Sequence, residues 1–377
     1  MQIRPGWQRS LTQAIMPDWC KSATIAVRNK LLALMNSTDS QNKAIPYKGR
    51  RISVAPMLDW TDRHCRLFHR QITRHTWLYT EMVTVGALLH GDVGRHLDYN
   101  SEEHPLALQL GGSDPGDLAK CAKLAEKWGY DEINLNCGCP SERVQKGAFG
   151  ACLMSESALV ADCVKAMRDA VSIDVTVKHR IGINDEESYD FVRDFIGSVK
   201  QAGCETFIVH ARNAILKGLS PKDNREIPPL KYDYAYRLKR DFPQLEILLN
   251  GGITTEAEID LHLQHVDGVM LGRAAYHNPY LMANFDAKYY DDDRQIMTRE
   301  EIVHAMLPYM RAQLQRFGKK GEGWLKPSSI TRHMLGLMAG MPGAKGFRQL
   351  LSDSARLIAD EDAVLLEALQ RMKIKSA

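Results

Sequence analysis

From residue 51 onward, the chain alternates short, almost wholly apolar runs with longer amphipathic segments. Apolar runs of this length are typical of strands buried on both faces, as in a parallel sheet that is covered by helices. The segments between them, such as residues 114–129, space their apolar residues by three and four, start near Asp or Ser and end at Gly, which predicts helices. The apolar runs lie at residues 51–57, 77–83, 105–112, 132–138, 174–180, 206–212, 246–252 and 268–274.

Eight consecutive strand-then-helix units predict an α/β fold, the TIM (β/α)8 barrel. An open doubly wound sheet would need a Gly-x-Gly-x-x-Gly turn after its first strand, and the sequence has none there. After about residue 296 the alternation stops, and the remaining segments are typical of helices joined by Gly, Pro and Lys loops. We therefore predict a basic, disordered extension over residues 1–50, a barrel over 51–296 and a C-terminal all-helical domain over 297–377. The alternative is that the last helices extend the barrel.

The composition is that of an ordinary soluble globular protein, with 44% hydrophobic and 25% charged residues. No apolar run approaches the ~18–20 residues of a membrane span. The net charge of +3 is unevenly distributed, because residues 1–51 hold nine Lys or Arg against two acids and residues 299–377 hold thirteen against eight. Basic ends favour a polyanionic partner, since Lys and Arg that neutralise phosphates release counterions. A solvated basic surface would have the same composition.

The eight cysteines are scattered, and no secretory signal precedes them, which predicts free thiols in a reducing cytoplasm. Two of them, Cys137 and Cys139, flank one glycine. Structural zinc would need wider spacing and a second pair of ligands, and a disulfide between the two would be too tight to relax, so we predict neither. Cys137 lies in a predicted strand. Cys139 stands at the strand tip near Arg143 and Lys146, where it is either one reactive thiol or an inert cysteine.

The carboxyl ends of barrel strands converge on one mouth, where the chemistry of such barrels takes place. Here they carry amides, cations, an imidazole and a thiol, as a bound polar cofactor would require. The "NGG" at 250–252 and the "LGR" at 271–273 follow strands seven and eight, after which barrels commonly bind phosphate. Lys178 and His210 would lie inside the mouth, where a cation can stabilise a reduced flavin. Taken singly, they would be a surface lysine and a core histidine.

Seven motifs in order carry a family resemblance: "SVAPMLDWTD", "ALQLGG", "NLNCGCPSERVQKGAFGACLM", "VTVKHRIGI", "VHAR", "LNGGI" and "VMLGRAAYHNP". Together they resemble the tRNA-dihydrouridine synthases, flavin enzymes in which a TIM barrel precedes a helical domain. Residues 218–243 and 330–349 resemble the A-type bacterial branch, which is associated with uridines 20 and 20a of the D-loop. The match runs from about residue 51 to near the C-terminus and leaves residues 1–50 outside.

The resemblance implies an oxidoreductase that reduces the uracil C5=C6 bond in tRNA. In the family NADPH reduces FMN, the flavin N5 passes hydride to C6, and the cysteine of Gly-Cys-Pro, here Cys139, donates a proton to C5. A thiol with an ordinary pKa of ~8.5 is mostly protonated at neutral pH, as this role requires. The FMN contacts of the family fall on Pro56, Met57, Gln109, Lys178, His210, Asn250, Gly251, Gly252, Gly272 and Arg273.

The resemblance also implies substrate contacts. Asn136 would hold the uracil or its ribose, and Arg180 matches the Lys-x-Arg pair of the fifth strand. The residue between the pair is His179 here, a position that strand alternation turns away from the mouth. Because the target base must leave its stack, we expect a basic surface beside the mouth. Its candidates are Arg212, Asn213, Lys217 and Arg332.

Two rival functions are alternatives to the synthase, and each leaves one feature of the sequence without a role. An FMN-dependent barrel reductase of a small enone or pyrimidine would share the phosphate site but have no use for the basic helical domain. A non-catalytic RNA-binding protein would leave the residues at the strand tips unexplained. We predict a cytoplasmic flavoprotein that uses FMN and NADPH and has tRNA as its partner, with no membrane and no obligate protein partner.

Overall fold

The computed structural model describes residues 49–318 and 325–376, which belong to one compact unit. The predicted extension over residues 1–50 lies outside the described residues except for its last two. The side chains of Arg143 and Lys146 also lie outside the described part of the chain.

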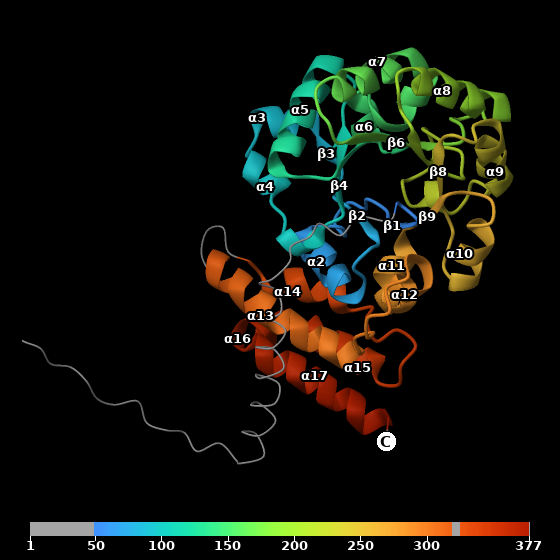
Figure 1. The fold of residues 1–377 in the computed structure, drawn as a ribbon. Helices are drawn as coiled ribbons and strands as arrows, with labels where there is room; N and C mark the ends of the chain where they lie inside the picture. The colour runs from blue at the N-terminus through green and yellow to red at the C-terminus, as the bar shows by residue number, and fades with distance from the viewer. Residues whose placement is uncertain (1–48, 319–324, 377) are drawn as a thin grey trace, which may run out of the picture. The chain divides into compact units, whose positions relative to one another are not determined.

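The barrel is a closed ring of parallel strands: β1 (Ile52–Val54), β2 (Trp77–Tyr79), β3 (Val83–Thr84), β4 (Leu106–Gly111), β5 (Glu132–Cys137), β6 (Asp174–Arg180), β7 (Thr206–His210), β8 (Glu246–Asn250) and β9 (Gly268–Leu271). The ring closes because β1 pairs with both β2 and β9. β2 and β3 pair with successive parts of β4, so these two short strands share one position. The ring therefore has eight positions, which coincide with the eight apolar runs, and the predicted TIM barrel is confirmed (Figure 1).

Helices cover the outer face of the ring, and each strand position is followed by at least one of them (Figure 1). The helices that follow the strands along the chain are α2 (Arg63–Ile72), α3 (Val85–His90), α4 (Val93–Leu97), α5 (Pro115–Trp128), α6 (Glu142–Lys146), α7 (Ser157–Arg168), α8 (Tyr189–Gln201), α9 (Tyr232–Asp241), α10 (Glu256–His262), α11 (Arg273–His277) and α12 (Phe285–Tyr290).

Helix α5 shows why these segments are helical. The side chain of Asp114 caps its N-terminus by accepting the N–H of Asp117, and Pro115 occupies the first turn, where its missing donor costs nothing. The helix ends at Gly129, whose φ of 91° suits a residue without a Cβ. The helix predicted over residues 114–129 is therefore confirmed. Its buried face consists of Leu118, Cys121, Ala122 and Ala125.

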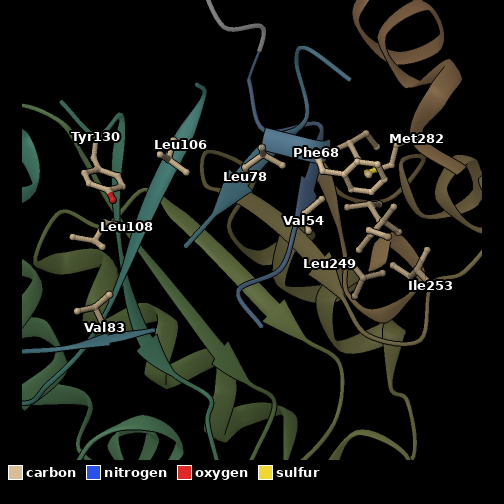
Figure 2. Close-up of a cluster of buried hydrophobic side chains, with 14 of the residues drawn as sticks. Val54, Phe68, Leu78, Val83, Leu106, Leu108, Tyr130, Leu249, Ile253 and Met282 are labelled. Carbon is tan, nitrogen blue, oxygen red and sulfur yellow. The ribbon is translucent and has the colours of Figure 1, made fainter. Parts of the chain in front are cut away.

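Side chains that point outward from the strands form the main core. Leu106 and Leu108 of β4 are fully buried, as are Leu78 of β2 and Phe68 of α2 (Figure 2). Each such side chain stabilises the fold by about 1.5–3 kcal/mol relative to an exposed position. This core fixes the outward face of every strand, and alternation then sends the next residue into the barrel.

The inward-pointing residues form two groups of different character. An apolar group consists of Ala55, Trp77, Tyr79, Ala107, Ile208, Leu248 and Met270. A polar group on the adjacent strands β4, β5 and β6 consists of Gln109, Glu132, Asn134, Asn136 and Thr176, all buried. Buried polar side chains require partners, so the polar group constrains its members more tightly than apolar packing would.

Arg50 closes the N-terminal end of the barrel. Its guanidinium donates to Glu132 at 2.6 Å, to Asp174 at 2.5 Å and to Glu246 at 2.9 Å. A polar cavity of about 300 Å³ adjoins this cluster and is lined by Asp174, Glu246 and Thr206 among others. These residues are engaged with Arg50 or with one another, and they lie at the end of the strands where barrels do not place their chemistry.

The C-terminal region consists of α13 (Arg299–Phe317), α14 (Pro327–Thr331), α15 (Ala344–Leu351), α16 (Ser354–Ala359) and α17 (Glu361–Ser376), which confirms the helical region predicted after the barrel (Figure 1). Helices α13 and α14 pack on α2. The prediction that this region forms a domain of its own, with a boundary at residue 296, stays a prediction. Among the described helices, none combines the length and apolar character that a bilayer crossing demands.

The helical region is also tied to the barrel by polar contacts at the N-terminus of α2. The carboxylate of Asp62 caps α2 and also accepts hydrogen bonds from Arg332 at 2.8 Å and from His333 at 3.0 Å. Nearby, the ring of His64 lies 2.6 Å from the hydroxyl of Tyr309. Asp62 therefore joins the loop after β1 to the helical region.

Candidate active site

The C-terminal ends of β5, β6, β7 and β8 bring five predicted site residues to one mouth. Asn136 is in register with Lys178, Arg180 is in register with His210, and His210 is in register with Asn250. Residues in register on neighbouring strands lie ~5 Å apart, so these side chains form an arc around the mouth. The register therefore brings these five strand-tip residues together, and their roles stay predictions.

The turn after β5 holds Cys139 at this mouth. The side-chain oxygen of Asn136 accepts the backbone N–H groups of Gly138 at 3.1 Å and Cys139 at 3.0 Å. The carbonyl of Cys139 accepts the N–H of Ala151 at 2.9 Å, which closes the following loop behind it. The sulfur lies 3.5 Å from the hydroxyl of Ser141, and Cys139 is partly exposed. The turn therefore presents one thiol from a defined backbone.

Cys137 is the last residue of β5 and points to the opposite side of the strand from Asn136. It is fully buried in the main core, and burial raises the pKa of its thiol well above the ordinary value. A thiol that is buried among apolar side chains is inert. All seven cysteines of the described residues are free thiols, so no disulfide links Cys137 to Cys139.

Lys178 is the cation of the mouth whose charge is most easily changed. Burial, followed by the charge of Arg180, lowers its pKa to about 7, while Cys139 acts in the opposite direction. Its ammonium donates to the side-chain oxygen of Asn250 at 3.1 Å. A lysine in this state gains charge when an anion binds beside it, which suits a site for a negatively charged group.

The surroundings of His210 favour its neutral form. It is buried, and its pKa is lowered well below the ordinary value by burial and then by the charges of Arg180 and Lys178. A neutral imidazole offers one donor and one acceptor, so His210 can form hydrogen bonds with a polar ring but adds no charge.

The glycines after β8 form a cradle that other residues could not. Gly251 has a φ of 122° and Gly252 a φ of 73°, which L side chains rarely adopt. A Cβ on Gly251 would meet the His210 ring at 2.8 Å, and a Cβ on Gly252 would meet Leu230 at 2.6 Å. By contrast, no other group lies within 4 Å of a Cβ built on Gly272, after the neighbouring strand β9. The turn after β8 is therefore closely packed against His210 and Leu230, whereas the turn after β9 has open space beside Gly272.

Four further residues of the predicted cofactor set border this mouth. Pro56 and Met57 follow β1 and are partly exposed. Gln109 is buried, and its amide is engaged at both ends, with Asn134 at 2.7 Å and Asn136 at 2.8 Å. Arg273 forms an ion pair with Glu226. Together with Lys178, His210 and the glycine cradle, this set provides an amide, two cations and glycine backbone; it fits FMN, and its individual contacts stay predictions.

Arg180 is a buried hub in this structure. Its guanidinium donates to the carbonyl oxygens of Gly138 at 3.2 Å, Asn213 at 3.2 Å and Asn224 at 2.9 Å. Burial lowers its pKa to about 10. The contacts of Arg180 therefore join the turn that holds Cys139 to the loop after β7.

The other predicted substrate residues differ in exposure. Lys217 is exposed, and Arg212 is partly exposed while it donates to the carbonyl of Pro228. Asn213 is buried and donates to the carbonyl of Asn184. Arg332 is 43% exposed and pairs with Asp62. Lys217 and Arg212 are thus best placed for RNA phosphates, and contact with RNA stays a prediction for all four.

His179 points away from the mouth, as strand alternation predicts. Its ring is fully buried and lies against Phe195 and Phe207, with ring centroids 5.2 Å and 5.9 Å away. Burial lowers its pKa to about 4. The substitution within the Lys-x-Arg pair therefore leaves the mouth unchanged.

The sequence interpretation missed the polar residues below the mouth. Glu132, Asn134 and Thr176 contribute no strand tip, yet they hydrogen-bond toward Asn136 inside the barrel. A signal was present in the sequence, because β5 alternates polar residues at 132, 134 and 136 with apolar residues at 133, 135 and 137. In a strand buried on both faces, a polar series of this kind indicates a polar interior.

Comparisons with known proteins point to one family. The family model described as "Dihydrouridine synthase (Dus)" matches residues 53–373. A protein of Pseudomonas putida named tRNA-dihydrouridine(20/20a) synthase is 58% identical over 328 residues, which covers 87% of this chain and 96% of that protein. Proteins of the same name from Pseudomonas aeruginosa and Vibrio parahaemolyticus are 59% and 57% identical, each over 85% of this chain and over 95% and 97% of their own lengths.

Proposed function

This chain belongs to the dihydrouridine synthase family and forms dihydrouridine in tRNA, and we propose that it does so at uridines 20 and 20a of the D-loop with FMN and NADPH. One observation carries the proposal. The turn that holds Cys139 and the cradle of Gly251 and Gly252 border one barrel mouth, three strand positions apart. This arrangement supports a proton donor and a phosphate site around a single opening.

FMN, once reduced by NADPH, would supply a hydride to C6 of the target uracil. The backbone of Gly251, Gly252 and Gly272 would hold its phosphate. Lys178, whose charge rises when an anion binds, would stabilise negative charge on the ring. The remaining contacts are assigned to Pro56, Met57, Gln109, His210, Asn250 and Arg273.

Cys139 would donate the proton that C5 requires. Addition of hydride at C6 and of the thiol proton at C5 saturates the bond and leaves a thiolate. Since Cys139 is partly exposed, water can return the proton before the next turnover. Proton transfer from a positioned acid typically contributes about 10²–10⁴-fold to a rate.

Asn136 would orient the uracil or its ribose. Its oxygen is used by the backbone of the turn, and one N–H donates to Gln109 at 2.8 Å. An amide nitrogen carries two hydrogens, so one N–H remains for a substrate oxygen. The backbone and the substrate would therefore be held by the same side chain.

Recognition of tRNA would extend beyond the mouth. We assign phosphate contacts to Arg212, Lys217 and Arg332, since guanidinium and ammonium groups neutralise phosphate charge. Arg180 and Asn213 would act through the loops that they hold. The two rival functions, a reductase of small enones or pyrimidines and a non-catalytic RNA-binding protein, lack the support that the family gives to the synthase.

The test maps dihydrouridine position by position in tRNA from cells that lack their own synthases, with and without this chain. We expect dihydrouridine to appear at positions 20 and 20a, and we expect the purified protein to be yellow and to release FMN on denaturation. A colourless protein, or one that oxidises NADPH with free enones but leaves tRNA unchanged, would contradict the proposal. Dihydrouridine at other positions would overturn only the assigned positions.

A further inference from the structure

A chain of hydrogen-bonded side chains runs through the polar half of the barrel to the turn that holds Cys139. It passes from Glu132 through Thr176, Asn134 and Gln109 to Asn136, and we call these five residues the interior relay. The successive contacts measure 2.5, 2.8, 2.7 and 2.8 Å. No member is more than 9% exposed, so these side chains are largely shielded from bulk solvent and require hydrogen-bond partners inside the barrel.

The relay has a direction that starts at Glu132. The carboxylate can only accept, and it takes the single hydroxyl hydrogen of Thr176. The oxygen of Thr176 is then left to accept from the NH₂ group of Asn134, which turns the oxygen of Asn134 toward Gln109. In the same way, the NH₂ group of Gln109 donates to Asn134, and the oxygen of Gln109 then accepts from the NH₂ group of Asn136.

The other end of the relay requires the same direction. The backbone N–H groups of Gly138 and Cys139 can only donate, so Asn136 must present its oxygen to them. Its nitrogen is then directed at the oxygen of Gln109. Both ends therefore select one orientation for all three amides, and reversal of a single amide would bring two donors or two acceptors together.

The starting carboxylate is held firmly. Besides Thr176, Glu132 accepts from the hydroxyl of Tyr79 at 2.8 Å and from Arg50 at 2.6 Å. The Arg50 guanidinium lies over the ring of Trp77, 4.5 Å from its centroid. The acceptor at the base of the relay is thus fixed in place by three donors.

We propose that the interior relay positions Cys139, with Glu132, Thr176 and Asn134 acting as positioning residues that keep Asn136 in the orientation the turn requires. The inference rests on the proposed function only in taking Cys139 as the proton donor. Removal of one hydrogen bond of the relay leaves a buried amide without its partner, so Gln109 and Asn136 are no longer restricted to one orientation. The backbone bonds of Gly138 and Cys139 then weaken, although neither residue has been changed.

The test replaces Thr176, because loss of Glu132 would leave Arg50 without its buried partner and endanger folding. Thr176→Val keeps the shape of the side chain and removes the hydroxyl, whereas Thr176→Ser keeps the hydroxyl. The matched control is Thr206→Val, since Thr206 is also buried inside the barrel but donates to Glu246, outside the relay. The first readout is hydrogen exchange at the backbone amides of Gly138 and Cys139, which needs neither cofactor nor tRNA.

We expect Thr176→Val to speed this exchange about tenfold, the factor that corresponds to loss of one typical hydrogen bond. We also expect it to lower kcat on tRNA by a similar factor while KM changes little, because the substrate surface is intact. Thr176→Ser should restore both, and Thr206→Val should change neither. Equal exchange and equal kcat in Thr176→Val and Thr206→Val would overturn the proposal.

A second variant covers the case in which Thr176→Val does not fold. Asn134→Leu interrupts the relay one residue nearer the turn, so it should give the same faster exchange. Where both variants fold, the double variant should be no worse than either one alone, since both break one chain, and additive effects would contradict the relay. Faster exchange without any dihydrouridine in tRNA would leave the relay standing and remove the proposed function instead.

Discussion

Cys137 and Cys139 are the same chemical group, separated by one glycine, and only their surroundings distinguish them. Cys137 is the last residue of β5 and points into the main core, whereas Cys139 lies past the end of the strand, in the turn at the mouth. We expect Cys139→Ala to lower the rate of dihydrouridine formation by about 10²–10⁴-fold while FMN stays bound, because the proton donor is lost but the cofactor contacts are not. The rate is measured on saturating tRNA, and bound FMN is measured after denaturation.

Cys137→Ala is the control for this prediction. It should keep the rate and lower the free energy of unfolding by about 1–2 kcal/mol, since it opens a small cavity in a packed core. If Cys137→Ala is inactive and Cys139→Ala is fully active, the assignment of the acid is wrong.

For single residues, the sequence indicated where a side chain lies but not which groups it forms hydrogen bonds with. The predicted end of β5 was enough to separate Cys137, within the strand, from Cys139, at its tip. It could not show that both ends of the Gln109 amide are engaged, or that Arg180 donates to three backbone carbonyls. Those partners depend on the register between strands, which a single sequence does not record.

Among the elements, the loop between β1 and α2 combines a rigid backbone with an exposed apolar side chain. Asp59 has a φ of 65°, and its N–H donates to Glu81 at 2.5 Å. The carbonyl of Met57 accepts the N–H groups of Trp60 and Thr61. Leu58, within this loop, is 69% exposed beside the mouth. A rigid apolar group at this place can contact a base that has left its stack.

We therefore expect Leu58→Ala to raise KM for tRNA about five- to tenfold, which corresponds to ~1–1.5 kcal/mol of lost apolar contact, with kcat nearly unchanged. Initial rates over a range of tRNA concentrations provide the measurement. Leu261→Ala is the matched control, because Leu261 is 51% exposed on α10, away from the strand tips. An equal KM in both variants would show that Leu58 does not meet the substrate.

The elements themselves were the best predicted part of this protein. All eight strand runs and the helical region after them were visible, because strands buried on both faces must be apolar throughout while the helices that cover them need only one apolar face. The run at residues 77–83 nevertheless divides into β2 and β3, which pair with different parts of β4. Propensity gives no sign of this interruption, since it arises from how the strand meets its neighbour in the closed ring.

For the molecule as a whole, one of the contacts that join the barrel to the helical region involves the charge of Asp62. Burial alone would raise the pKa of Asp62, but the hydrogen bond and charge of His333, with the charge of His64 and the N–H of Cys65, lower it well below the ordinary range. Arg332 adds a further hydrogen bond at 2.8 Å. A carboxyl whose pKa is lower in the folded state stabilises that state when it is ionised.

Asp62→Asn tests this contact, because asparagine still caps α2 but carries no charge for Arg332 and His333. We expect a loss of about 1–3 kcal/mol in the free energy of unfolding at pH 7. The stabilisation is complete above the unfolded pKa of ~3.9 and is lost as pH falls toward the lower folded value, so the gap between the two proteins should shrink below about pH 4. Urea unfolding of both proteins between pH 8 and pH 3 measures this difference in the free energy of unfolding.

The control is Asp117→Asn, which removes an exposed carboxylate that pairs with Lys120 on α5. Exposed pairs of this kind contribute at most about 0.5 kcal/mol, so this variant should differ little from the parent at any pH. A loss for Asp62→Asn no greater than for Asp117→Asn, or a loss that grows as the pH falls, would show that Asp62 does not join the two regions through its charge. Asp62 lies in the same loop as Met57 and Leu58. A confirmed loss of stability in Asp62→Asn would therefore mean that the contact with the helical region also holds the loop that borders the mouth.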